Sequence, residues 1–180
     1  VQIRKTHQDG FKHVDELKIN QQNFNQSANN FTMKYGYHGD QDRARWLDYE
    51  YRINWNLYGG ATWSSDWQST NDFIIPVVPP HKYREVVVEA DPTVLNDAGV
   101  RLATVQFTSE LFGKQDTQSV SLKTTGDGTL SKTIRYAHEP NDYEYWYDIS
   151  WLKRGNVQLK QTGIQGNAGF IFADELPEEE

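Results

Sequence analysis

The sequence predicts an all-β protein made of two tandem antiparallel β-sandwich units, the first of which lacks its opening strand. Three observations lead to this fold class. A passage of the sequence is repeated in the same spacing, short runs alternate apolar and polar residues, and no long segment shows an apolar period of 3.6 residues.

The repeat is clearest in one aromatic strand and the turn after it. The two copies are 96 residues apart (151 − 55 = 96). In the first copy the matched residues are Tyr49, Tyr51, Ile53, Trp55 and Gly59, and in the second they are Tyr145, Tyr147, Ile149, Trp151 and Gly155. Phe73–Ile75 corresponds to Phe170–Phe172 at an offset of 97, and Val1–Ile3 to Val105–Phe107 at an offset of 104. The register drifts only where loops are expected, because loops absorb insertions and strands do not. Duplication of a whole structural unit explains the pattern.

The repeat divides the chain into residues 1–80 and 81–180, each large enough to bury its own core. The junction reads Pro76-Val77-Val78-Pro79-Pro80. Proline restricts the residue before it, so we expect this connection to be short and semi-rigid.

The second copy opens with an extended segment, Tyr83–Ala90, and an Asp91-Pro92 turn, whereas Val1 of the first copy already matches Val105. We therefore expect unit 1 to lack its first strand and the chain to be a mature or excised part of a longer protein. A sandwich without such a strand exposes unpaired backbone groups. The sequence leaves open whether another chain supplies the strand.

Seven strands are predicted in unit 2, which is the number typical of a sandwich. They span residues 84–90, 100–109, 118–124, 132–137, 143–152, 157–162 and 169–173. Turn-forming residues separate them, among them Gly126-Asp127-Gly128. The strands predicted in unit 1 span 31–37, 47–57, 61–67 and 72–78, and Gln21–Asn30 is interpreted as a loop or a poorly formed strand.

The strand over Tyr143–Leu152 has one aromatic and apolar face and one polar face, because side chains alternate along a strand. Leu47–Leu57 repeats the pattern. We expect both ladders of rings to be buried, each in the interior of its own unit.

The run Asn141-Asp142-Tyr143-Glu144-Tyr145 resembles the start of the penultimate strand in immunoglobulin-like and fibronectin type III domains. In those domains a tyrosine anchors a corner by bonding to the backbone. The resemblance covers about ten residues in each unit, lacks the paired cysteines and concerns the fold alone. It implies immunoglobulin-like units and transfers no functional residues.

Composition excludes several classes of protein. With 37% hydrophobic residues and a net charge of −7, the chain is typical of soluble globular proteins, and an acidic chain without a basic stripe is not expected to bind nucleic acid. No apolar run is long enough to span a bilayer. The absence of cysteine excludes disulfides and thiolate nucleophiles and favours a bacterial envelope protein, periplasmic or at the cell surface.

The ionisable residues suggest no reaction. The five histidines show no metal-ligand spacing and no pairing with a nucleophile, and His38 and His138 are interpreted as structural. Two carboxylate clusters are interpreted as solvated turns rather than calcium sites; they comprise Asp40, Asp42 and Asp48, and Glu139, Asp142 and Glu144. We therefore expect no enzyme activity, metal or cofactor.

Three tryptophans without an aromatic counterpart in the other copy are the candidate ligand-binding residues: Trp46, Trp67 and Trp146. Trp146 falls on the polar face of its strand, where a flat ring suits stacking on a sugar or a protein contact. The alternative is that the other unit or a neighbouring copy covers it.

The sequence thus favours a noncatalytic structural or protein-binding module of a larger envelope or cell-surface protein, with a protein or neighbouring repeat units as partner. The alternative is a carbohydrate-binding module that uses the three tryptophans on a polysaccharide. A third hypothesis, an enzyme, requires a cleft that holds a nucleophile or an acid of perturbed pKa, and the sequence nominates no residue for it. A pocket with converging histidine and carboxylate side chains would favour this hypothesis.

Overall fold

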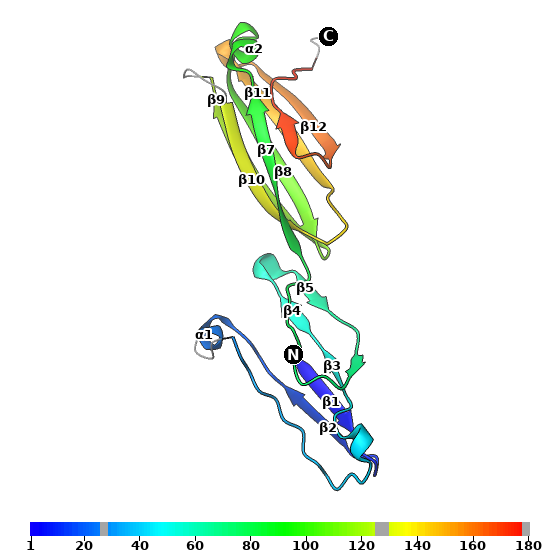
Figure 1. Ribbon diagram of the computed structural model, residues 1–180. Coiled ribbons are helices and arrows are strands. Elements are labelled where there is room, and N and C mark those ends of the chain that lie inside the picture. Colours follow the sequence, from blue (N-terminus) through cyan, green and yellow to red (C-terminus); the bar gives the residue numbers. More distant parts are fainter. Residues whose placement is uncertain (26–28, 125–129, 178–180) are drawn as a thin grey trace. The chain divides into compact units, whose positions relative to one another are not determined.

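The computed structural model describes residues 1–25, 29–124 and 130–177, and Figure 1 labels most of its strands and the short helices α1 and α2. The all-β prediction is confirmed. Contacts divide the chain into two compact units, Val1–Tyr58 with Thr62–Pro79, and Pro80–Glu180 with Gly59–Ala61. In the described ranges, no helix has the length and apolar character needed to cross a membrane.

Unit 2 contains all seven predicted strands: β7 (Lys82–Ala90), β8 (Val100–Leu111), β9 (Lys114–Lys123), β10 (Leu130–His138), β11 (Tyr145–Lys153), β12 (Gln158–Gly166) and β13 (Phe170–Phe172). They form two sheets, ordered β10-β7-β13 and β12-β11-β8-β9. A short helix, α2 (Pro92–Asp97), joins β7 to β8 where the sequence predicts a turn at Asp91-Pro92; Asp91 caps the helix and Pro92 is its first residue.

Strand β7 lies in the middle of the three-stranded sheet. It pairs antiparallel with β10 along its whole length, from Lys82 opposite His138 to Ala90 opposite Leu130. On its other edge it pairs with β13, and this pair is parallel, an exception to the antiparallel arrangement. Both outer strands therefore depend on β7 for their backbone hydrogen bonds within this sheet.

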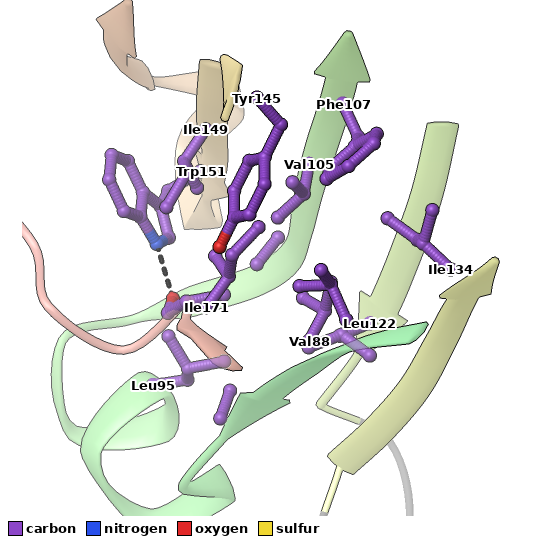
Figure 2. Close-up of a cluster of buried hydrophobic side chains, with 14 of the residues drawn as sticks. Val88, Leu95, Val105, Phe107, Leu122, Ile134, Tyr145, Ile149, Trp151 and Ile171 are labelled. Atoms are coloured by element: carbon purple, nitrogen blue, oxygen red, sulfur yellow. Dashed lines mark hydrogen bonds between the residues drawn. The ribbon is translucent and has the colours of Figure 1, made fainter. Parts of the chain in front are cut away.

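The interior of unit 2 lies between its two sheets (Figure 2). Val86 and Val88 of β7 and Trp151 of β11 are each 0% exposed, and Ile171 of β13 is 1% exposed. The indole nitrogen Nε1 of Trp151 donates to the carbonyl of Ala173 at 2.7 Å, the bond drawn in Figure 2. This bond ties the end of β13 to the opposite sheet.

The strands of unit 1 are β1 (Gln2–Thr6), β2 (Lys12–Glu16), β3 (Tyr49–Arg52), β4 (Asn54–Asn56), β5 (Thr62–Ser64) and β6 (Gln68–Thr70). Four of them form a sheet ordered β2-β1-β3-β6, and β4 pairs with β5. The predicted strand over 47–57 is thus interrupted at Ile53, and the predicted strand over 61–67 is shorter and followed by β6. Strand β2 was not predicted.

The register shows that this sheet repeats the four-stranded sheet of unit 2. Ile3 lies opposite Tyr51 as Phe107 lies opposite Tyr147. Likewise, the pairs Trp55 with Trp63 and Tyr49 with Thr70 correspond to Trp151 with Leu159 and Tyr145 with Gly166. The matched glycines after the strand, Gly59 and Gly155, have φ angles of 82° and 81°, which side chains with a Cβ rarely adopt.

Two strand predictions in unit 1 are wrong. Residues 31–37 and 72–78 contain no strand, although their counterparts in unit 2 include β10 and β13. The described residues ahead of Pro80, 1–25 and 29–79, include no counterpart of β7. Without that central strand, neither flanking segment has a strand to pair with, which explains why neither forms a strand.

The aromatic ladder is enclosed in unit 2 but only half-buried in unit 1. Tyr145, Ile149 and Trp151 are 2% exposed or less, whereas Ile53 and Trp55 are half-buried. The missing layer accounts for the difference, because one sheet covers only one side of its side chains.

Three other expectations concern segments that are partly or wholly outside the described residues. Within Gln21–Asn30, the segment Gln21–Phe24 forms a short helix, α1, and residues 26–28 are outside the described part. The turn at Gly126-Asp127-Gly128 is outside it as well, as are residues 178–180 of the C-terminal tail.

A glycine in β12 provides a test of the packing in unit 2. A Cβ added at Gly166 would lie 2.5 Å from Cε2 of the buried Tyr145 ring, whereas a Cβ at Gly169 would meet nothing within 4 Å. Gly166→Ala is expected to lower the free energy of unfolding of unit 2 by about 1–3 kcal/mol, and Gly169→Ala to change it by less than about 0.5 kcal/mol. Urea unfolding followed by NMR signals of Ile149 and Ile171 measures both. Equal effects would contradict the described contact.

Candidate functional site

The side of the unit 1 sheet that carries Ile3, Ile53 and Trp55 is here named the inner face, because its counterpart in unit 2 faces the interior. Part of this face is covered by residues 31–37. Phe31, Met33 and Tyr35 are half-buried and the residues between them are exposed, so the segment alternates as a strand would. The rings of Tyr35 and Tyr49 are 5.5 Å apart, which places this end of the segment against β3.

Trp55 carries an unmet hydrogen-bonding group on this face. Its Nε1 is buried and has no partner among the described residues. In unit 2 the matched nitrogen, Nε1 of Trp151, bonds to Ala173, whose counterpart is Pro76 (173 − 76 = 97). A buried donor without an acceptor costs about 1–3 kcal/mol. The inner face of unit 1 therefore contains a buried indole N–H, that of Trp55, without a hydrogen-bond acceptor among the described residues.

The segment of unit 1 that corresponds to β13 exposes two large apolar side chains. Ile74 is 80% exposed and Phe73 is 86% exposed, whereas Ile171, the counterpart of Ile74, is 1% exposed. Burying an isoleucine side chain contributes about 1.5–3 kcal/mol. Unit 1 does not gain this free energy at Ile74, whereas unit 2 gains it at Ile171.

Lys5 closes one end of the inner face. Its side chain is buried in a loop, and its Nζ donates to three backbone carbonyls, of Arg45 at 3.0 Å, Trp46 at 3.1 Å and Asp48 at 2.7 Å. All three donors of the ammonium group are thereby used. Lys5 anchors the loop that precedes β3.

His7 and Asp40 form a second buried anchor beside Lys5. Nδ1 of His7 lies 2.9 Å from Oδ2 of Asp40, and the backbone amide of Gln8 donates to Oδ1 at 2.9 Å. The hydrogen bond from Gln8, with a further contribution from His7, holds the pKa of Asp40 below its usual range. The expectation that Asp40 belongs to a solvated turn is wrong, since the residue is 6% exposed.

A cavity of about 330 Å³ adjoins these anchors, and its lining residues are Lys5, Thr6, His7, Gln8, Gly10, Asp40, Asp42, Arg45 and Asp48. The cavity brings His7 together with Asp40, Asp42 and Asp48, the combination of histidine and carboxylates named above for an enzyme, and Nδ1 of His7 is engaged by Asp40. The described residues contain no group of three or more histidine or carboxylate side chains placed to hold a metal ion. The His7–Asp40 pair instead holds the loop against β1.

Sequence reasoning did not single out Lys5 and His7, although a signal was present. They follow Val1 and Ile3 at alternate positions, and alternation along β1 puts all four on the inner face.

Two of the predicted ligand-binding tryptophans, Trp46 and Trp67, lie on opposite sides of unit 1. Nε1 of Trp46 donates to the carbonyl of Asp40 at 3.1 Å, on the side of Lys5. The ring of Trp67 lies 4.2 Å from the guanidinium of Arg4, which neighbours Lys5 in β1 and points the other way. Trp46 and Trp67 therefore do not form one stacking platform.

Trp146 belongs to unit 2 and lies in β11, between Thr108 of β8 and Gln165 of β12. It is 37% exposed, on the face of the strand opposite Tyr145. A ring in this position can stack on a ligand.

Unit 2 also exposes aromatic side chains on the outer face of its three-stranded sheet. The rings of Phe170 and Phe172 stack at 6.4 Å, and each is about half exposed. Tyr83 of β7 lies on the same face, 4.5 Å from the guanidinium of Arg135.

No family model, curated protein or solved structure matches this chain.

The Asp40 anchor predicts a pH dependence. Because the pKa of Asp40 is depressed in the folded state, its stabilising effect is fully present above the ordinary value of 3.8 and is lost as the pH falls through the lower, folded value. We expect the amide signal of Gln8 to titrate with a midpoint below 3.8. NMR between neutral and acidic pH measures it. The step should vanish in Asp40→Asn, and a midpoint at or above the ordinary value would contradict the anchor.

Proposed function

We propose that this chain is a noncatalytic protein-binding pair of β-sandwich units within a larger envelope or cell-surface protein. The observation that carries the proposal is the contrast between Ile74, 80% exposed, and its buried counterpart Ile171. An apolar side chain next to backbone without strand partners is the kind of surface that another polypeptide covers.

Several features support a protein as the partner. Phe73, Ile74 and Val78 are each at least 66% exposed and lie close together in the sequence. Large exposed apolar side chains of this kind favour contact with protein, because aromatic and aliphatic side chains dominate the centre of interfaces. The net charge of −7 disfavours nucleic acid.

The geometry near Tyr143 supports an immunoglobulin-like relationship for unit 2. The Tyr143 hydroxyl donates to the carbonyl of Pro140 at 3.3 Å, three residues upstream, just before β11. A tyrosine at this place in an immunoglobulin-like domain bonds back to the backbone in the same way. Such units commonly serve as spacers and binding modules of surface proteins. The chain has no cysteine, so these units would fold without a disulfide.

Carbohydrate binding is the second candidate function, and one observation favours it. Trp146 exposes 37% of its surface on a strand face between polar neighbours. A polysaccharide would stack a sugar ring on this indole.

Site-specific crosslinking tests the proposal. A photoreactive amino acid is placed at Ile74 and, as a control, at Val94, which is 45% exposed on α2 of unit 2. In an envelope extract we expect one discrete protein adduct at position 74 and none at position 94. Absence of an adduct at position 74, or the same adducts at both positions, would contradict protein binding through this surface.

A glycan array with the same chain tests the alternative. Binding of a polysaccharide that Trp146→Ala abolishes would favour the carbohydrate-binding function. The protein-binding function predicts no glycan signal.

A further inference from the structure

The cavity beside Lys5 and His7 is formed by two segments of unit 1 that are far apart in the sequence. Its lining residues between Lys5 and Gly10 come from the end of β1 and the turn after it, and those between Asp40 and Asp48 come from the loop before β3. The volume of about 330 Å³ corresponds to about ten water molecules at ~30 Å³ each. Small-molecule sites in proteins begin at about this volume, so the cavity can hold a small organic molecule.

The cationic groups of the lining are largely engaged by the protein itself or by solvent. The three hydrogen-bond donors of the Lys5 ammonium group all go to backbone carbonyls. The guanidinium of Arg45 lies 3.8 Å from Oδ2 of Asp48, and 69% of the Arg45 side chain is exposed, so most of it contacts solvent. An anionic ligand would therefore find few cationic donors in the cavity.

The carboxylates of the lining differ in how far the protein satisfies them. Both oxygens of Asp40 have partners inside unit 1. Oδ1 of Asp42 accepts from the backbone amide of Ala44 at 3.0 Å, and Oδ2 of Asp48 faces Arg45. Within the described part of the chain, no donor contacts Oδ2 of Asp42 or Oδ1 of Asp48. Two carboxylate oxygens of the lining are therefore free to accept hydrogen bonds from a ligand.

The charged oxygens of Asp42 and Asp48 determine which ligand chemistry fits the cavity. Three carboxylates in the lining would repel an anion, and an apolar ligand would cover charged oxygens without giving them a partner. A primary ammonium group carries a positive charge and three N–H donors, and it forms short charge-assisted hydrogen bonds with carboxylates. The lining therefore favours a cationic ligand that donates hydrogen bonds.

We propose that the cavity of unit 1 binds a small organic cation through a primary ammonium group, which donates hydrogen bonds to the side chains of Asp42 and Asp48. Buried contacts of Lys5 and His7 hold the loop that carries both carboxylates. The lining contains none of residues 73–78, so this site goes beyond the proposed protein-binding surface and does not depend on it.

Three compounds with the same four-carbon chain test the ligand class on the full 180-residue chain. The ends of 1,4-diaminobutane are ammonium groups, those of 1,4-butanediol are hydroxyl groups and those of succinate are carboxylates. NMR titrations at neutral pH and about 0.15 M salt compare them, because this salt concentration largely screens exposed charges from one another. We expect diaminobutane to shift the backbone amide signals of Gln8, Gly10 and Asp42 to saturation. Butanediol should bind about tenfold more weakly or worse, and succinate should not bind.

Two carboxylate variants of unit 1 form a matched control. Asp42→Asn removes a carboxylate from the lining and keeps a side chain that can cap the short helix Arg43–Arg45, because asparagine is also a good cap. Asp66→Asn makes the same change of charge at an exposed residue outside the lining. Asp42→Asn should weaken diaminobutane binding by about tenfold and Asp66→Asn by less than about twofold, with both variants folded as judged by NMR.

Saturable binding of diaminobutane that depends on Asp42 and not on Asp66 supports the site. Absence of saturation, or equal binding of diaminobutane and butanediol, overturns it. Equal weakening by the two variants also overturns it, because the effect is then the general attraction of a cation by a chain of net charge −7. Crosslinking at position 74 reports on a surface outside the lining, so its result is independent of this one.

Discussion

The structure depends on one strand, β7, which supplies backbone partners to two others and apolar side chains to the interior. In unit 2 it holds β10 on one edge and β13 on the other, and Val86 and Val88 are fully buried between the sheets. Buried backbone groups must be paired, so a central strand determines whether its neighbours become strands at all. Trp151 also holds the two sheets together, because its hydrogen bond to the carbonyl of Ala173 links the end of β13 to the opposite sheet.

Unit 1 shows what the same design becomes without that strand. Its sheet keeps the register of the unit 2 sheet, from Ile3 opposite Tyr51 to Trp55 opposite Trp63. One end of its inner face is closed by polar contacts, in which Lys5 bonds to three carbonyls and His7 contacts Asp40. The other layer is represented by segments without strand partners, and Ile74 is left exposed. Unit 1 therefore exposes apolar side chains because it has no second sheet to cover them.

Much of the fold could be predicted because alternation and the repeat are properties of the sequence itself. The seven strands of unit 2 and the matched ladder from Tyr145 to Trp151 follow from the period of two and from the repeated spacing. Residues 31–37 alternate in the same way, yet they form no strand, because a strand also needs a partner at a distance. The repeat shows that unit 1 lacks a counterpart of the opening strand, but the effect on the two neighbouring segments depends on pairing between distant parts of the chain.

The candidate site was less predictable, for a related reason. The tryptophans were chosen because they lack aromatic counterparts, but whether rings share a surface depends on which face of the sheet each one occupies, and Trp46 and Trp67 lie on opposite faces. The burial of Asp40 depends on His7 and Gln8, which are more than thirty residues away in the chain. Such contacts are fixed by the tertiary fold, and composition or local spacing does not reveal them.

The exchange rates of the two matched indole N–H groups, measured by NMR on the intact chain, test the central claim most directly. The account predicts that the group of Trp151, which is buried and bonded to Ala173, exchanges only when unit 2 unfolds. The group of Trp55, which has no acceptor within the described part of the chain and lies under an incomplete layer, should exchange faster by orders of magnitude. Equal protection of the two would show that unit 1 is as closed as unit 2 and would contradict the account.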